Sequence, residues 1–171
     1  MKKPSIFILD VDGVMTDGML YYTIEGKVMK RFGPDDHDGL NLIKQYLPVQ
    51  FISGDAKGFA ITAKRIRDDM QYPLELVSTI HRRNWIAERY PLDEVIYMGD
   101  GIFDALVLGR VGYGIAPSNA SPLAKSAAHF VTQAAGGDRA VAEACIHLLE
   151  KFFEPLNLEG LLVKKIEVSG T

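Results

Sequence analysis

The sequence has little of what marks a secreted, membrane-bound or nucleic-acid-binding protein. It contains one cysteine in 171 residues, so an internal disulfide is excluded. That residue, Cys145, lies in an Ala-rich apolar stretch, where we expect a core residue rather than a nucleophile. The apolar run after Lys3 is short and leads directly into Asp10, unlike a signal peptide or a membrane span. A net charge of -3 gives no support to nucleic-acid or membrane binding, so we expect a cytoplasmic protein with neither partner.

Internal repeats, low-complexity segments and linkers are also absent, and 47% of the residues are apolar. We expect a single domain, residues 1–171, with a substantial core. Strand and helix patterns alternate along the chain, which predicts an α/β fold with a doubly wound (Rossmann-like) parallel sheet flanked by helices. The predicted strands end near Leu9, Ile52, Val77, Met98, Ala116 and Val131. The predicted helices cover about 40–47, 58–70, a segment ending near 90, 102–111 and 140–153, and a loop with a helical turn is predicted over 118–128.

The first strand leads straight into two carboxylates one residue apart, Asp10 and Asp12, and Gly13 follows. In parallel α/β sheets, ligands bind just beyond the carboxyl ends of the strands. Two like charges this close need a counter-cation or a shared proton, and a hard divalent ion meets that need most simply. A solvated acidic turn is the alternative, because Asp-Gly is also a common turn dipeptide.

Polar residues follow the later strands as well. Ser53 and Gly54 offer a hydroxyl and free backbone N–H groups that suit a phosphate oxygen, although the same residues are common in turns. Asp100 follows a later strand between two glycines, and Asp104 comes four residues on, in the first turn of a predicted helix.

Two arginines, Arg82 and Arg83, stand at the head of the helix that ends near residue 90. A cation there is unfavourable against the helix dipole, and an anion in a nearby site would explain it. The alternative is a pair of exposed arginines. Because the carboxyl ends of parallel strands share one edge of the sheet, all these residues should converge on a phosphate site with a divalent cation.

Three other segments give expectations of their own. Residues 19–32 form a predicted β-hairpin, either a flap over the site or a plain edge hairpin. Asp36 and Asp38 precede a helix, and we expect a helix cap or a loop that faces the substrate rather than a second metal pair. The stretch 154–171 is too apolar for a free tail, so we expect it to pack against something.

These motifs resemble those of the haloacid-dehalogenase-type phosphatases, in the same order along nearly the whole chain. The matching motifs are Asp10 to Val14 with Thr16 and Asp17, then Ser53 and Gly54, and then Gly99 to Asp104. The hairpin, the segment 32–39 and the Gly136-Gly137 loop further resemble the small cap-less 3-deoxy-D-manno-octulosonate 8-phosphate phosphatases. They are also similar to the phosphatase-like domains of acylneuraminate cytidylyltransferases and to ketodeoxynononate 9-phosphate phosphatases.

The resemblance implies a magnesium-dependent phosphatase acting on a phosphorylated sugar acid. It makes Asp10 the nucleophile and Asp12 the general acid and base. It implies that Mg²⁺ is held by Asp10, Asp100 and the backbone carbonyl of Asp12. It also implies that Ser53 and Arg83 bind the phosphoryl group and that Asp104 orients the cation or a metal-bound water. The residues implied in substrate binding are Gly13, Gly54, Asp36 and Arg82.

Three positions depart from the family pattern. The family usually has lysine where an ungapped reading places Arg83, with Arg82 as the competitor, and arginine is a planar fork rather than a point charge. Gly101 stands where a second aspartate is common. Asp55 replaces an arginine that octulosonate phosphatases usually have, which puts the identity of the sugar in doubt more than the reaction.

Neither stretch between the motifs has room for a cap domain, so the site should stay open in a monomer. Resemblance to the cap-less phosphatases implies a homotetramer, in which the hairpin or the tail of a neighbouring subunit covers the site. Two other functions stay open. One is a catalytically weak scaffold domain, which the Arg83 and Gly101 departures would suit. The other is a receiver-type phospho-acceptor module, against which the alternate spacing of Asp10 and Asp12 argues.

Overall fold

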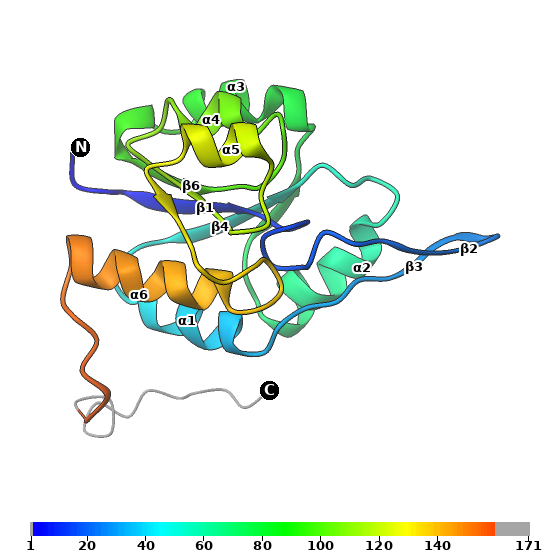
Figure 1. Cartoon of the computed structure of the whole chain (residues 1–171), viewed down its shortest axis with the longest axis horizontal. Helices are drawn as coiled ribbons and strands as arrows, with labels where there is room; N and C mark the ends of the chain where they lie inside the picture. Colours follow the sequence, from blue (N-terminus) through cyan, green and yellow to red (C-terminus); the bar gives the residue numbers. More distant parts are fainter. Residues whose placement is uncertain (1, 160–171) are drawn as a thin grey trace.

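The computed structural model describes residues 2–159 and consists of a parallel sheet between two layers of helices (Figure 1). The six-stranded sheet has the order β5-β4-β1-β6-β7-β8, and every neighbouring pair is parallel. The strands are β1 (Ile6–Asp10), β4 (Val49–Ser53), β5 (Leu74–Leu76), β6 (Val95–Met98), β7 (Tyr113–Ala116) and β8 (Phe130–Val131). The predicted fold class is confirmed, and the strand order reverses between β1 and β6.

The central strand β1 is buried along its whole length because helices cover both faces of the sheet. Alternate side chains point to opposite faces. Phe7 and Leu9 belong to one core cluster, and Ile6 and Ile8 belong to the other. This double burial explains why the strand reads as an unbroken apolar run.

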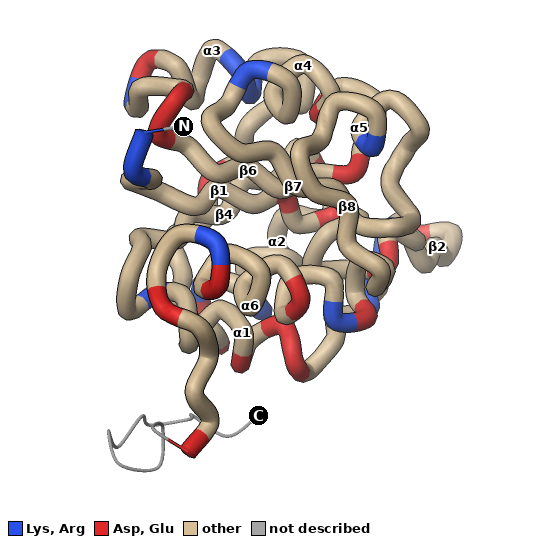
Figure 2. Tube along the Cα trace, turned by 60° about the vertical axis from the view of Figure 1, so that its left-hand side comes forward, with Lys and Arg blue, Asp and Glu red and all other residues tan. Residues whose placement is uncertain are grey.

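Helices of both layers are visible in two views (Figures 1 and 2). One face carries α1 (Asp35–Ile43), α2 (Phe59–Ala63) and α6 (Ala140–Phe152), and the other carries α3 (Arg82–Ala87), α4 (Ala105–Leu108) and α5 (Pro122–Ala127). Three short helices complete the helices of the described residues: a π-helix, η1 (Lys64–Asp69), and two 3-10 helices, η2 (Thr79–His81) and η3 (Leu92–Glu94). The helix predicted over 58–70 is thus α2 continued by η1, and the one predicted over 102–111 is reduced to α4.

The start of α1 was predicted wrongly. This helix begins at Asp35 after Pro34, so Asp38 lies within it and does not cap it. A Pro-Asp-Asp sequence suits a helix start, because proline fixes a helical φ and acidic residues favour the positive end of the helix dipole.

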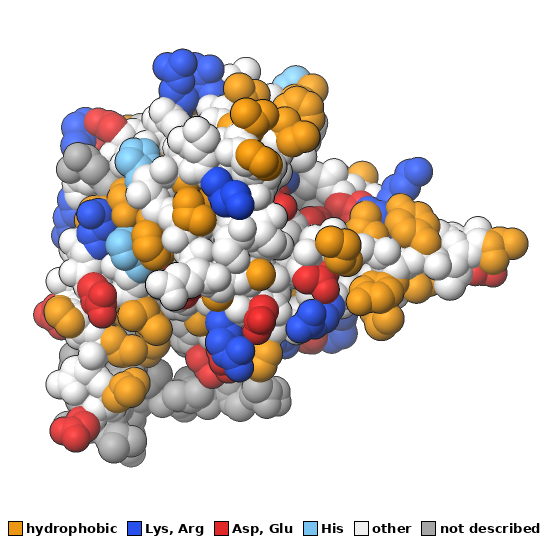
Figure 3. Space-filling view, in the orientation of Figure 1, with side chains coloured by type: hydrophobic (Ala, Val, Ile, Leu, Met, Phe, Trp, Pro, Cys, Tyr) orange, Lys and Arg blue, Asp and Glu red, His pale blue; other side chains and the backbone are white. Residues whose placement is uncertain are grey.

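The hairpin consists of β2 (Tyr21–Thr23) and β3 (Gly26–Met29) and projects away from the sheet (Figures 1 and 3). An antiparallel bridge between Thr16 and Phe32 fixes its base. Its tip is strongly exposed, with Ile24 at 98%. Among the described residues, nothing but this hairpin and α1 lies between β1 and β4, so no cap domain interrupts the fold there.

The described part of the tail ends at Glu159. Phe152 and Phe153, just before the tail, pack against the core, whereas Leu158 is 68% exposed. Residues 160–171, the remainder of the stretch that was expected to pack, lie outside the described residues. Within residues 2–159, no helix combines the length and hydrophobicity that a membrane span requires.

Candidate active site

The site lies where the strand order reverses, at the carboxyl ends of β1, β4 and β6. Asp10 is the last residue of β1 and Ser53 the last of β4, and Asp100 follows β6 by two residues. Since β1 pairs with both β4 and β6, these three side chains are brought to one place. Such a crevice is the usual ligand site of an open α/β sheet.

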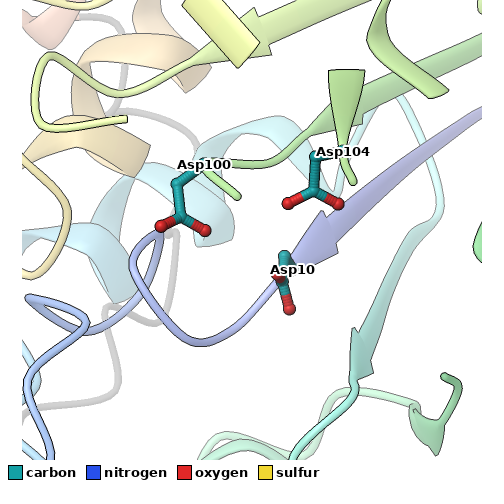
Figure 4. A group of neighbouring side chains, drawn as sticks. All are labelled: Asp10, Asp100 and Asp104. Atoms are coloured by element: carbon teal, nitrogen blue, oxygen red, sulfur yellow. The ribbon is translucent and has the colours of Figure 1, made fainter. Parts of the chain in front are cut away.

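Three carboxylates meet there (Figure 4). Oxygen atoms of Asp10, Asp100 and Asp104 all lie within 4.8 Å of one another. Asp104 precedes α4 and is fixed by its neighbours: the hydroxyl of Tyr97 donates to Oδ1 at 2.5 Å and the backbone N–H of Gly101 donates to Oδ2 at 2.8 Å. The structure therefore brings Asp10 and Asp100 together and places Asp104 beside them as a third carboxylate.

Gly13 leaves the space that the Asp100 carboxylate occupies. Its φ is +82°, and a Cβ atom there would lie 2.0 Å from Asp100 Oδ2. Only glycine combines this backbone conformation with such a close contact. Gly13 therefore lies against a carboxylate of the site, and its predicted role in substrate binding stays a prediction.

Arg82, and not Arg83, supplies the cation of the site. The Arg82 guanidinium group lies 2.5 Å (Nη1) and 2.9 Å (Nη2) from the two oxygens of Asp10, and its Nη1 lies 2.7 Å from Asp104 Oδ1. Arg82 is 1% exposed, whereas Arg83 is exposed. The reason is helical geometry, since Arg82 and Ile86 form the buried face of α3 and Arg83 lies on the solvent face.

Burial and mutual repulsion disfavour ionisation of the carboxylates. Burial raises the pKa of Asp10 to about 8, aided by Asp104 and opposed by Arg82. Burial and Asp104 likewise raise the pKa of Asp100 to about 7. Burial alone would lower the pKa of Arg82, but contacts with Tyr97, Asp10 and Asp104 raise it, so Arg82 stays charged.

One guanidinium group therefore faces three carboxylates, and the surplus negative charge needs protons or a cation. An all-carboxylate donor set suits a hard divalent ion. The residues present fit such an ion.

Asp12 is held apart from these carboxylates. Ser53 Oγ donates to Asp12 Oδ2 at 3.2 Å, and Lys30 Nζ forms an ion pair with Asp12 Oδ1 at 2.7 Å. Its carboxylate is thus not part of the candidate metal cluster. The prediction of a metal ligand at Asp12 concerned its backbone carbonyl, and it stays a prediction.

A pocket of about 290 Å³ opens onto these groups. It is lined by Asp10, Asp12, Gly18, Leu20, Lys27, Gly54, Asp55, Thr79 and Arg82. The strand-end reasoning missed Lys27, Lys30 and Tyr97. No motif in the sequence singled out the two lysines of the hairpin region or Tyr97 in the core of β6.

Asp36 does not face the pocket. It is fully buried, and its Oδ1 accepts a hydrogen bond from the backbone N–H of Ala142 at 3.0 Å, in the first turn of α6. Burial raises its pKa to about 6. The substrate-facing prediction for Asp36 is therefore wrong, because the side chain joins α1 to the start of α6. Asp38 is exposed on α1.

Comparisons with known proteins show the family of the chain. A family model for haloacid dehalogenase-like hydrolases matches residues 85–144. A 3-deoxy-D-manno-octulosonate 8-phosphate phosphatase from Yersinia pestis is 31% identical over 151 residues, which cover 82% of this chain and 76% of that protein.

Solved structures share the fold over almost the whole chain. A probable YrbI family phosphatase from Pseudomonas syringae is 30% identical, with a TM-score of 0.80 and coverage of 97% of this chain and 94% of that one. The 3-deoxy-D-manno-octulosonate 8-phosphate phosphatase of Moraxella catarrhalis, solved with magnesium, phosphate and KDO, gives a TM-score of 0.81 at 24% identity, with coverage of 95% and 94%. The chain therefore belongs to the haloacid dehalogenase-like hydrolases, in the family of the 3-deoxy-D-manno-octulosonate 8-phosphate phosphatases, and is a phosphoric monoester hydrolase.

Proposed function

We propose that the protein is a magnesium-dependent phosphatase that hydrolyses a phosphorylated sugar acid of the 3-deoxy-D-manno-octulosonate 8-phosphate type through an aspartyl phosphate. The observation that carries the proposal is the position of Asp10, which lines the pocket and lies within 4.8 Å of both Asp100 and Asp104. The Yersinia pestis and Moraxella catarrhalis relatives are named as phosphatases of that substrate, and the Moraxella catarrhalis structure holds magnesium, phosphate and KDO.

Asp10 and Asp100 would hold the metal ion, together with the backbone carbonyl of Asp12. When bound, the ion neutralises charge on the phosphoryl oxygens during an in-line displacement. Asp104, which already accepts hydrogen bonds from Tyr97 and Gly101, would fix Arg82 beside the metal ligands.

In the first step, a carboxylate oxygen of Asp10 attacks phosphorus, and the bond from phosphorus to the sugar oxygen breaks. The carboxyl group of Asp12 gives its proton to the leaving oxygen, so the sugar departs as a neutral alcohol. Asp10 is then esterified to the phosphoryl group. This is covalent catalysis, which divides one difficult step into two.

In the second step, the ionised Asp12 takes a proton from water, and the resulting oxygen attacks phosphorus. The bond from phosphorus to Asp10 breaks, inorganic phosphate leaves, and Asp12 regains its proton. Asp12 has a partly exposed side chain (25%) next to the pocket, as an acid that exchanges protons with substrate and water requires.

Ser53, Gly54 and Arg82 would bind the transferring phosphoryl oxygens. Ser53 is fully buried, and its hydroxyl donates a hydrogen bond to Asp12, which lines the pocket. Arg82 would exchange one of its contacts with Asp10 for the phosphoryl group, which frees an oxygen of Asp10 for attack. Preorganised donors of this kind commonly supply much of the stabilisation of a transition state.

The direct test is a screen of the purified protein against phosphorylated sugars with Mg²⁺ and with EDTA. We expect release of phosphate from a phosphorylated sugar acid, lost with EDTA and in Asp10→Asn, whose circular dichroism stays that of the wild type. Absence of turnover on every sugar phosphate would favour the scaffold function instead. A single phosphorylation without turnover would favour a receiver-type module.

We also propose a homotetramer in which apolar segments of a neighbour cover the open site. The exposed apolar side chains of the hairpin support it, among them Tyr22, Ile24, Val28 and Met29, which are exposed by 50–98%. Light scattering at micromolar protein should give a tetrameric mass. A monomeric mass with full activity would refute this assembly.

A further inference from the structure

One buried lysine outside the roles assigned so far contacts the proposed acid. Lys30 follows β3 at the base of the hairpin, and its side chain has 0% exposure. Its Nζ lies 2.7 Å from Asp12 Oδ1, 2.9 Å from Asp55 Oδ2 and 2.9 Å from Thr62 Oγ1. The contact with Thr62 is a hydrogen bond, and the contacts with Asp12 and Asp55 are buried ion pairs.

The surroundings of Lys30 are built to hold it. A Cβ atom on Gly58 would lie 2.2 Å from Asp55 Oδ2 and 3.0 Å from Lys30 Cε, so glycine leaves the room that this ion pair needs. Asp55 Oδ1 accepts the backbone N–H of Gly58 at 3.0 Å and also pairs with Lys27. Burial opposes its ionisation, but the two lysines and Gly58 lower the pKa of Asp55 to about 2, so Asp55 is a permanent anion beside Lys30.

These contacts fix the orientation of the Asp12 carboxyl group at both oxygens. Lys30 holds Oδ1, and the buried hydroxyl of Ser53 donates to Oδ2 at 3.2 Å. Without Lys30, the carboxyl group would have one anchor on one side and could rotate. A general acid must lie within hydrogen-bond reach of the oxygen that it protonates, so this orientation bears on the rate.

We propose that Lys30 is a positioning residue for Asp12, whose carboxyl group it holds in the orientation that protonates the leaving sugar oxygen. The inference rests on the proposed function, which makes Asp12 the acid. It predicts a loss that depends on the leaving group. A sugar alkoxide needs a proton to depart, whereas p-nitrophenolate is a stable anion that leaves without one.

If Lys30 had only a structural role, its loss would affect the two kinds of substrate differently from this prediction. The hairpin has other attachments, namely the bridge between Thr16 and Phe32 and the ion pair of Lys27 with Asp55. If Lys30 only secured the hairpin, its loss would lower hydrolysis of every substrate by a similar factor.

The test compares Lys30→Met with the wild type on two substrates, the sugar phosphate that the wild type hydrolyses fastest and p-nitrophenyl phosphate. We expect kcat on the sugar phosphate to fall by roughly 10- to 100-fold, part of the ~10²–10⁴-fold that general acid catalysis supplies, with a much smaller change on p-nitrophenyl phosphate. The ratio of the two rates is independent of the fraction of folded protein. Lys64→Met, which alters an exposed ion pair with Asp69, is the control and should match the wild type.

Two further variants complete the test. Thr62→Val removes one partner of Lys30 and should move the ratio in the same direction by a smaller factor. In an Asp12→Asn background, Lys30→Met should cause no further loss on the sugar phosphate. Equal losses on both substrates, no loss, or losses that multiply in the double variant would each overturn the inference. Wild-type turnover by Asp12→Asn alone would instead refute the role of Asp12, and the inference with it.

Discussion

The guanidinium group of Arg82 spans both carboxylate oxygens of Asp10, with N–O distances of 2.5 and 2.9 Å, in a site where both residues are at least 95% buried. A buried ion pair is costly to break from one side, because the partner is left with an uncompensated charge. This pair therefore links the stability of the domain to the position of its proposed nucleophile.

Two replacements of Arg82 distinguish the effect of its charge from the effect of its planar shape. We expect Arg82→Met to destabilise the fold by about 3 kcal/mol and to lower kcat by about 100-fold or more, since it removes the cation from the phosphoryl site. Arg82→Lys keeps the charge and should retain much more activity. Denaturant unfolding and steady-state kinetics measure both effects.

Arg83→Met is the matched control, because Arg83 is exposed on the neighbouring position of the same helix. Its kinetics and stability should equal those of the wild type. Loss of activity in Arg83→Met, with activity kept in Arg82→Met, would contradict the placement of the two residues.

The contact between Gly13 and Asp100 gives a second prediction. Gly13→Ala places a methyl group 2.0 Å from Asp100 Oδ2 and requires an unfavourable φ of +82°. We expect weaker Mg²⁺ binding by titration calorimetry, along with lower stability. Gly26→Ala is the control, since Gly26 also has a positive φ but no atom within 4 Å of its Cβ position. It should lose stability alone, and equal loss of Mg²⁺ affinity in both variants would contradict the proposed place of Asp100.

The raised pKa values of Asp10 and Asp100, about 8 and about 7, predict that Mg²⁺ competes with protons. Metal binding needs ionised carboxylates, so Mg²⁺ affinity should rise from pH 6 to pH 8.5 and binding at pH 7 should release protons. Calorimetry in buffers of different ionisation enthalpy measures the number released. Binding that is independent of pH and of buffer would show that these two carboxylates are not the ligands.

The same pKa values fix the sign of a stability effect. Both folded-state values lie above the usual value of an unfolded aspartate, so the folded protein binds more protons and is favoured at lower pH. Without metal, stability should therefore fall as the pH rises from 6.5 to 8.5, through the range in which these groups ionise. Saturating Mg²⁺ should offset this fall. Thermal unfolding with and without Mg²⁺ tests both statements, and a metal-free protein that gains stability over this range would contradict the account.

Asp36 gives a prediction that separates structure from substrate binding. Asp36→Ala leaves the N–H of Ala142 without its buried acceptor and should cost about 1–3 kcal/mol of stability. Because Asp36 does not line the pocket, KM and kcat of the folded protein should not change. A raised KM at wild-type stability would restore the view that Asp36 faces the substrate.

The sequence predicted the fold well because its strongest signals are local. Runs such as residues 95–98 are apolar throughout, as strands buried on both faces must be, and they end at glycines that mark the turns. The positions of Asp10, Ser53 and Asp100 then follow from one topological rule. The strand reasoning brought together the two residues on which the candidate metal site depends.

The wrong or missing predictions concern residues whose positions are determined by long-range packing. Whether Arg82 or Arg83 faces the site depends on the rotation of α3, which is set by the packing of Ile86 and which no count along the chain reveals. Asp36 was assigned to the substrate because its partner, the start of α6, lies about a hundred residues away. Lys30 was missed because its partners come from three separate segments of the chain.

The most direct test of the account is to locate the phosphoryl group during turnover. The enzyme is mixed with its sugar phosphate and Mg²⁺, quenched in acid within milliseconds, digested and analysed by mass spectrometry. The account predicts a phosphorylated peptide whose modification maps to Asp10, absent in Asp10→Asn and present at raised levels in Asp12→Asn, where release to water is slowed. Phosphoryl transfer to another residue, or normal turnover by Asp10→Asn, would contradict it.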